Sequence, residues 1–90
     1  MTKYELTPME RELAELMVNV LLLEIEPDQI DPKAALFRDG LGLDSIDALE
    51  LAIYLKKDYE LLIKVEDEES RSIFASLSDL AAYVEENLQR

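Results

Sequence analysis

Apolar residues recur at helical spacing in three stretches of the chain, and turn-forming residues separate these stretches. The first stretch opens with Thr7 as a helix N-cap, Pro8 at the first helical position and Glu10 placed for a capping box. Its apolar side consists of Met9, Leu13, Leu16, Met17 and Val20, and its polar side of Glu10, Arg11, Glu12, Glu15 and Asn19. The pattern predicts a helix over residues 8–23, which Pro27 prevents from continuing.

The second stretch predicts a helix over residues 45–59 that has two apolar sides. An ordinary core stripe is formed by Ala48, Leu51, Ala52, Leu55 and Tyr59. A second apolar set, here called the outer strip, consists of Ile46, Leu49 and Ile53 and is interrupted by Glu50 and bordered by Asp47. Because one apolar stripe is enough for a helix to join a small bundle, the outer strip predicts a docking surface.

The other segments complete a helical domain. Residues 24–42 form a long connection whose apolar members are expected to fold over the core, with a short helical turn within residues 32–37. Residues 60–69 are expected to be irregular, and residues 70–74 to form a short helix with Ile73 and Phe74 facing inward. Ser76 and Asp79 predict the start of a last helix over residues 77–88. The predicted fold is all-α, a small antiparallel four-helix bundle with three main helices, one short helix and a long first loop, forming one domain over residues 1–90.

The amino-acid composition excludes several classes of function. The chain has 90 residues, of which 9 are basic and 21 acidic, for a formal net charge of −12. Such a chain repels nucleic acid and anionic membranes and attracts basic protein surfaces. There is no Cys and no His, which excludes Ser-His-Asp and Cys-His catalysis and His-ligated zinc within this chain. Without a signal peptide or an apolar run long enough to cross a bilayer, we expect a cytoplasmic, monomeric protein with no bound metal.

One motif joins the connection to the second helix. Residues 39–47 are Asp-Gly-Leu-Gly-Leu-Asp-Ser-Ile-Asp. Asp44 is a good helix N-cap, Asp47 stands three residues later, and Ser45 takes the first helical position. A serine there suits the presentation of a hydroxyl better than packing. The motif, followed by Ala-Leu-Glu-Leu, resembles the modification site of acyl carrier proteins, and the capped first helix, long loop and final helix resemble that family as well.

The resemblance implies a carrier and not an enzyme. In that family the serine, here Ser45, carries covalent 4′-phosphopantetheine, whose thiol holds an acyl chain. Acids at the positions of Asp44, Asp47 and Glu50 contact basic patches on partner enzymes, and Ile46, Leu49 and Ile53 match the apolar contacts. The implied partners are a phosphopantetheinyl transferase and acyl-processing enzymes. Lys56 and Lys57 stand where fatty-acid carriers often have acids, which argues against general fatty-acid synthesis. Residues 37–43 resemble carriers of specialised bacterial acyl or polyene pathways.

Alternatives remain at this stage. Ser and Asp crowd helix starts for local hydrogen-bonding reasons, so Ser45 alone also fits a structural role. An acidic helical adaptor would explain the charge and the outer strip, but not the glycines before Ser45. A peptidyl carrier usually has Gly-Gly-x-Ser-Leu, whereas Asp-Ser-Ile-Asp favours an acyl or polyketide carrier, and the single short domain favours a dissociated pathway.

Overall fold

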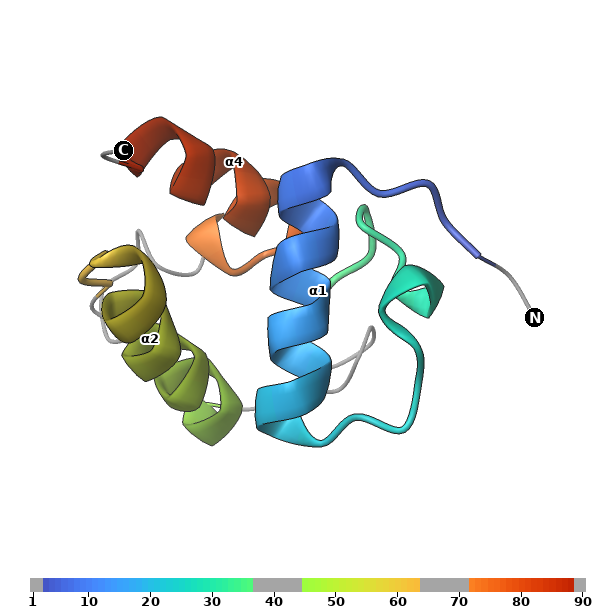
Figure 1. The fold of residues 1–90 in the computed structure, drawn as a ribbon, viewed down its shortest axis with the longest axis horizontal. Coiled ribbons are helices and arrows are strands. Elements are labelled where there is room, and N and C mark those ends of the chain that lie inside the picture. Colours follow the sequence, from blue (N-terminus) through green and yellow to red (C-terminus); the bar gives the residue numbers. More distant parts are fainter. Residues whose placement is uncertain (1–2, 37–44, 64–71, 89–90) are drawn as a thin grey trace.

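The computed structural model describes residues 3–36, 45–63 and 72–88. Within these ranges the chain forms three α-helices and one 3-10 turn, in the order α1 (Pro8–Leu21), η1 (Pro27–Gln29), α2 (Ser45–Tyr59) and α4 (Leu77–Asn87) (Figure 1). The described ranges contain no strand, only an isolated antiparallel bridge between Ala35 and Ser76. The predicted all-helical class is therefore confirmed.

Helix α1 begins as its capping pattern predicts. The Glu10 backbone N–H donates to Thr7 Oγ1 at 3.1 Å, and the Thr7 N–H donates to Glu10 Oε1 at 3.0 Å. This box turns Glu10 toward the protein and leaves it 8% exposed, so its assignment to the polar side was wrong. The helix also ends two residues earlier than predicted, because Leu22 adopts a left-handed conformation with φ 53° and caps it well before Pro27.

The long connection is tied to the rest of the protein at three points. The Tyr4 N–H donates to Asp28 O at 2.7 Å, the Ser78 N–H to Pro32 O at 2.9 Å, and the Leu36 N–H to Ala75 O at 3.1 Å. Ile30 and Leu36 are each 1% exposed, which confirms that this connection folds over the core. Its helical turn is η1 and not residues 32–36, because Pro27 starts a turn and Gln29 closes it on Glu26. Phe37, Leu41 and Leu43 lie outside the described residues.

Helix α1 is the centre of the fold and contacts α4, η1 and α2. Helix α2 runs antiparallel to α1, and the Tyr59 hydroxyl near its end donates to Glu12 Oε1 at 2.7 Å (Figure 1). Helix α4 lies across the N-terminal end of α1. The largest fully buried side chains come from all these segments: Leu13, Met17, Ile30, Leu36, Leu51, Leu55, Phe74, Leu77, Leu80 and Val84.

The predicted four-helix bundle is not confirmed in that form. Of the short helix expected at residues 70–74, Ser72 and Ile73 have helical backbone, whereas residues 70–71 lie outside the described part of the chain. Phe74 is buried and Ile73 half-buried against the core, as expected. Helix α4 ends at Asn87, one residue before the predicted end. None of the described helices is both long and apolar enough to cross a membrane.

Candidate functional site at the start of helix α2

Ser45 is the first residue of α2, as predicted. This end of the helix lies beside the C-terminal end of α1, at the bottom of Figure 1. The residues expected to shape the turn before it, Gly40, Gly42 and the cap residue Asp44, lie outside the described residues. Helix α2 itself is described over its whole length, so the structure tests the two-sided pattern that follows Ser45.

The core stripe of α2 holds the helix against the protein. Leu51 is 1% exposed, Leu55 is 0% exposed and Ala48 is 3% exposed, and Tyr59 packs partly buried at the far end. These residues repeat every three or four positions, which places them on one side of an α-helix. Their burial confirms the predicted core stripe and means that α2 presents its opposite side in a fixed orientation.

The outer strip is on that opposite side. Ile46 is 68% exposed, Leu49 is 53% exposed and Ile53 is 58% exposed. Fully burying an isoleucine or leucine side chain is worth about 1.5–3 kcal/mol, and these three residues leave most of that gain unused within the described protein. Packing among the described residues therefore does not account for the outer strip, whereas contact with another molecule would.

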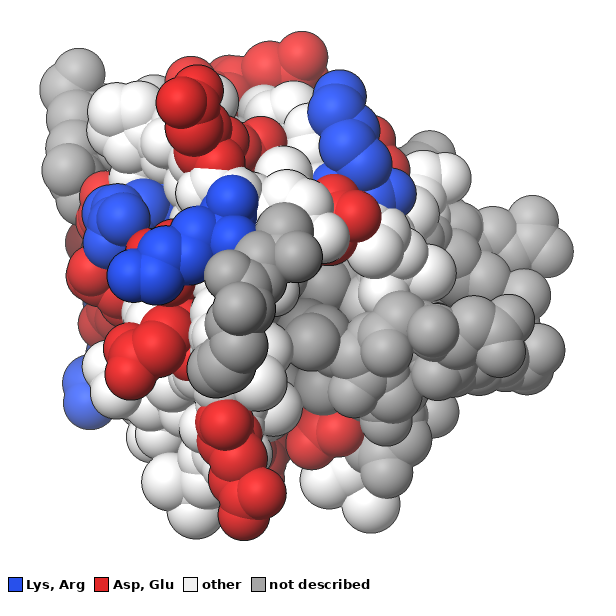
Figure 2. All heavy atoms as spheres, turned by 90° about the vertical axis from the view of Figure 1, so that its right-hand side faces the viewer, with Lys and Arg blue, Asp and Glu red and all other residues white. Residues whose placement is uncertain are grey.

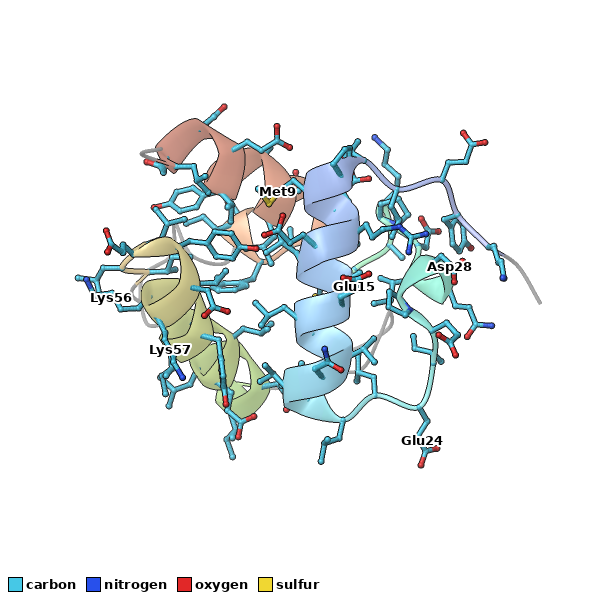
Figure 3. The ribbon with its side chains drawn as sticks, in the orientation of Figure 1. Met9, Glu15, Glu24, Asp28, Lys56 and Lys57 are labelled. Carbon is cyan, nitrogen blue, oxygen red and sulfur yellow. The ribbon has the colours of Figure 1, made fainter. Side chains whose placement is uncertain are left out.

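Charged side chains of opposite sign accompany the outer strip along α2. Glu50 is exposed and Asp47 half-buried in the first part of the helix. Lys56 and Lys57 are exposed in its last turn and point away from α1 (Figure 3). Acids near a helix start and bases near its end interact favourably with the helix dipole. The outer side of α2 is therefore apolar along its length, acidic at its start and basic at its end.

One contact on this side was missed in the sequence. Lys57 Nζ lies 5.9 Å from the centre of the Tyr54 ring, within the range of a cation–π interaction. Tyr54 is 38% exposed, so the ring extends the apolar side toward the lysines. The signal was present, because Tyr54 and Lys57 are three positions apart and such pairs are neighbours on a helix.

The start of α2 has the chemistry needed to carry a covalently attached phosphate-containing group. A serine hydroxyl can carry a phosphodiester, and the N–H groups and dipole of a helix start favour negative charge beside it. Within the described residues there is no cluster of acids that could hold a metal ion. The start of α2 offers a serine to which phosphopantetheine can be attached, and the exposed Ile46 directly follows Ser45.

Comparison with known proteins agrees with this reading. The family described as "Phosphopantetheine attachment site" matches residues 11–84, a span that contains all of α2. The chain is also 37% identical over 73 residues to a protein from Phytoplasma australiense named "Acyl carrier protein", covering 81% of this chain and 88% of that protein. The chain therefore belongs to the acyl carrier protein family, whose members are not enzymes but carriers of covalently attached 4′-phosphopantetheine.

Proposed function

We propose that this carrier holds acyl or polyketide intermediates as thioesters on 4′-phosphopantetheine attached to Ser45, and delivers them to partner enzymes in the cytoplasm. The observation that carries the proposal is the position of Ser45 as the first residue of α2, directly before the exposed outer strip. The prosthetic group supplies a terminal thiol, which the protein, having no Cys, does not supply itself.

The start of α2 suits the attachment of a phosphodiester for electrostatic reasons. A negative group beside a helix N-terminus is stabilised by about 0.3–1 kcal/mol at an exposed position. The modifying transferase joins the Ser45 oxygen to the phosphopantetheinyl phosphorus, breaks the pyrophosphate bond of coenzyme A and releases adenosine 3′,5′-bisphosphate. Because the transferase also takes up the hydroxyl proton, this chain needs no catalytic base of its own. The absence of His from the whole sequence is compatible with that division of labour.

The outer side of α2 supports a role in partner recognition. Glu50 and Asp47 offer carboxylates near the attachment residue, and Asp44 precedes it in the sequence. We propose that these three acids contact basic patches on the transferase and on acyl-processing enzymes. Ile46, Leu49 and Ile53 then fill apolar depressions on the same partners, because their exposed area is left over after the domain has folded.

The sequence around Ser45 supports an acyl or polyketide cargo over a peptidyl one. Residues 43–46 are Leu-Asp-Ser-Ile, in place of the Gly-x-Ser-Leu end of the peptidyl carrier motif. The relative from Phytoplasma australiense is also named as an acyl carrier. We propose that the lysines in the last turn of α2 belong to a carrier of a specialised acyl pathway.

The test is modification by a promiscuous phosphopantetheinyl transferase with coenzyme A. We expect one adduct on the wild type and none on Ser45→Ala. Ser78→Ala is the matched control, because Ser78 also lies in the first turn of a helix, α4, and its main-chain bond to Pro32 survives the change. Ser78→Ala should be modified at the wild-type rate. An adduct on Ser45→Ala, or none on the wild type, would contradict the proposal.

A further inference from the structure

The outer side of α2 has two charged ends of opposite sign. The α-helix rises about 1.5 Å per residue, so Glu50 and Lys57 are separated by about 10 Å along the axis. Exposed charges are screened over about 8 Å at physiological ionic strength. The acidic first half and the basic last turn of α2 therefore act on a partner as two separate charged sites, with Glu50 within the outer strip and the lysines beyond Ile53.

Three exposed charges on this side of α2, Glu50, Lys56 and Lys57, are not paired within the described part of the protein. The ion pairs there join Lys3 to Asp28 at 3.7 Å and Arg11 to Glu15 at 3.9 Å. Lys56, Lys57 and Glu50 form no ion pair with any of the described residues. Lys57 lies over the Tyr54 ring, which holds its ammonium group at the end of the apolar side.

Helix stability explains the charged residues near the two ends of α2 but not the exposed apolar residues on the same side. Acids in the first turn and lysines in the last turn stabilise any helix through its dipole. The same effect gives no reason for Ile46, Leu49 and Ile53 to be more than half exposed, or for a tyrosine ring to lie beside Lys57 on the surface. An exposed apolar strip with the unpaired acid Glu50 in its first half and unpaired lysines beyond its last residue suits a protein surface of complementary charge.

We propose that the outer side of α2 docks on a protein surface that is polarised in the opposite sense. Such a partner has Arg or Lys side chains opposite Asp47 and Glu50, an apolar depression opposite the outer strip, and Asp or Glu side chains opposite Lys56 and Lys57. The proposal deepens the carrier role proposed above and rests on it, because the partner is an enzyme that acts on the group at Ser45.

Polarised docking fixes the direction in which α2 lies on its partner. Turning the helix end for end would place like charges together at both ends, which costs several kcal/mol in typical interfaces. A uniformly basic partner would meet repulsion from Lys56 and Lys57. These two lysines and Tyr54 are therefore specificity-determining residues, which select partners with acids at the far end of the contact.

The test places a photo-crosslinking residue at either end of the outer strip. The full chain carries p-benzoylphenylalanine in place of Ile46 or of Tyr54, is expressed in its native host and is irradiated there. Mass spectrometry then identifies the attached peptides. Each version is also made with Lys56→Glu/Lys57→Glu, and with the control Lys3→Glu/Lys33→Glu, which makes the same charge change at exposed lysines outside α2.

The proposal expects both probes to label one partner protein. The Tyr54 position should label a segment rich in Asp and Glu, and the Ile46 position a segment rich in Lys and Arg. Reversal of Lys56 and Lys57 should lower the yield at least tenfold, equivalent to about 1.4 kcal/mol, while the control changes it little. A basic segment at the Tyr54 position, a second copy of this chain, an unchanged yield after reversal, or no labelling at all would each overturn the proposal.

The same samples also test the proposed carrier function independently of the docking proposal. The intact mass of the recovered chain reports whether the prosthetic group is attached. Unmodified protein that still labels a polarised partner would contradict the carrier function alone. Modified protein without the two-ended labelling pattern would contradict polarised docking alone.

Discussion

Adjacent positions on α2 serve different purposes. Leu55 is 0% exposed and packs in the core, whereas Ile53, two residues earlier, is 58% exposed in the outer strip. Both are large aliphatic residues on one helix, so hydrophobicity alone does not distinguish them. Their positions around the helix axis do, because Leu55 faces the core and Ile53 faces outward.

The difference between these two residues is measurable by thermal unfolding. Leu55→Ala leaves a cavity in a closed core and should cost about 2–5 kcal/mol of unfolding free energy. Ile53→Ala removes a mostly solvated side chain and should stay within about 0.5 kcal/mol of the wild type. Equal losses in the two variants would contradict the two-sided structure of α2.

Single residues were predicted well where periodicity decides their environment. The buried and exposed sides of α2 follow from spacing, because each of its residues has one position around the axis. Glu10 was assigned to the wrong side because its environment depends on a reciprocal bond with Thr7 and not on periodicity. The Tyr54–Lys57 contact depends on the side-chain rotamers, which spacing alone does not determine.

The ends of α1 and α2 share a feature that their sequences hide. Leu22 after α1 and Glu60 after α2 both have positive φ, of 53° and 58°. At the end of α2 the Glu60 N–H donates to Lys56 O at 3.0 Å and the Leu61 N–H to Leu55 O at 3.3 Å. This is the hydrogen-bonded helix ending that usually contains glycine. A search for glycine or proline therefore placed the end of α1 too late.

Replacing Glu60 with glycine tests this ending. A left-handed non-glycine residue costs about 1–2 kcal/mol, and the greater freedom of glycine in the unfolded chain offsets about 0.5–1 kcal/mol of that. Glu60→Gly should therefore be more stable by about 0.5–1 kcal/mol and melt a few degrees higher. Glu60→Gln, which removes the charge and keeps the side chain, is the control and should gain less than Glu60→Gly. If Glu60→Gly is less stable than the wild type, the left-handed conformation of Glu60 is not strained.

The long connection shows where prediction of elements fails. Its buried apolar residues could be predicted, since Ile30 and Leu36 have no other reason to be apolar in a polar loop. Its helical turn was placed at residues 32–37, but the structure has it at η1. Between two prolines, local propensity allows a turn at either site. Long-range main-chain bonds to Tyr4, Ala75 and Ser78 select the observed path, and these bonds have no local signature in the sequence.

The molecule as a whole is strongly acidic, but its acidic side chains differ in whether a basic side chain lies beside them. On the face formed by η1 and the N-terminal segment, acidic and basic side chains are interspersed (Figure 2), and the Lys3–Asp28 pair lies in this region. Glu50 on α2 has no such neutralising lysine among the described residues. A net charge of −12 attracts basic partners in general, and the proposed role of α2 is to fix where such a partner binds.

Charge reversal at Glu50 tests this use of the surface. Glu50→Lys should slow modification by the transferase with little change in stability, because exposed interface charges act mainly on association rate. Glu24→Lys makes the same charge change in the connection after α1 (Figure 3) and should slow modification less. The gap between the two variants should widen at low ionic strength, where screening is weaker. Equal rates would show that α2 is not the recognition surface.

The central claim is that Ser45 carries the prosthetic group. It is tested most directly by mass spectrometry of the protein purified from its native host, followed by peptide mapping. We expect one phosphopantetheine adduct, located on the peptide that contains Ser45 and extended in part of the sample by an acyl group. An adduct located on any other residue, or protein that is wholly unmodified in its own host, would contradict it.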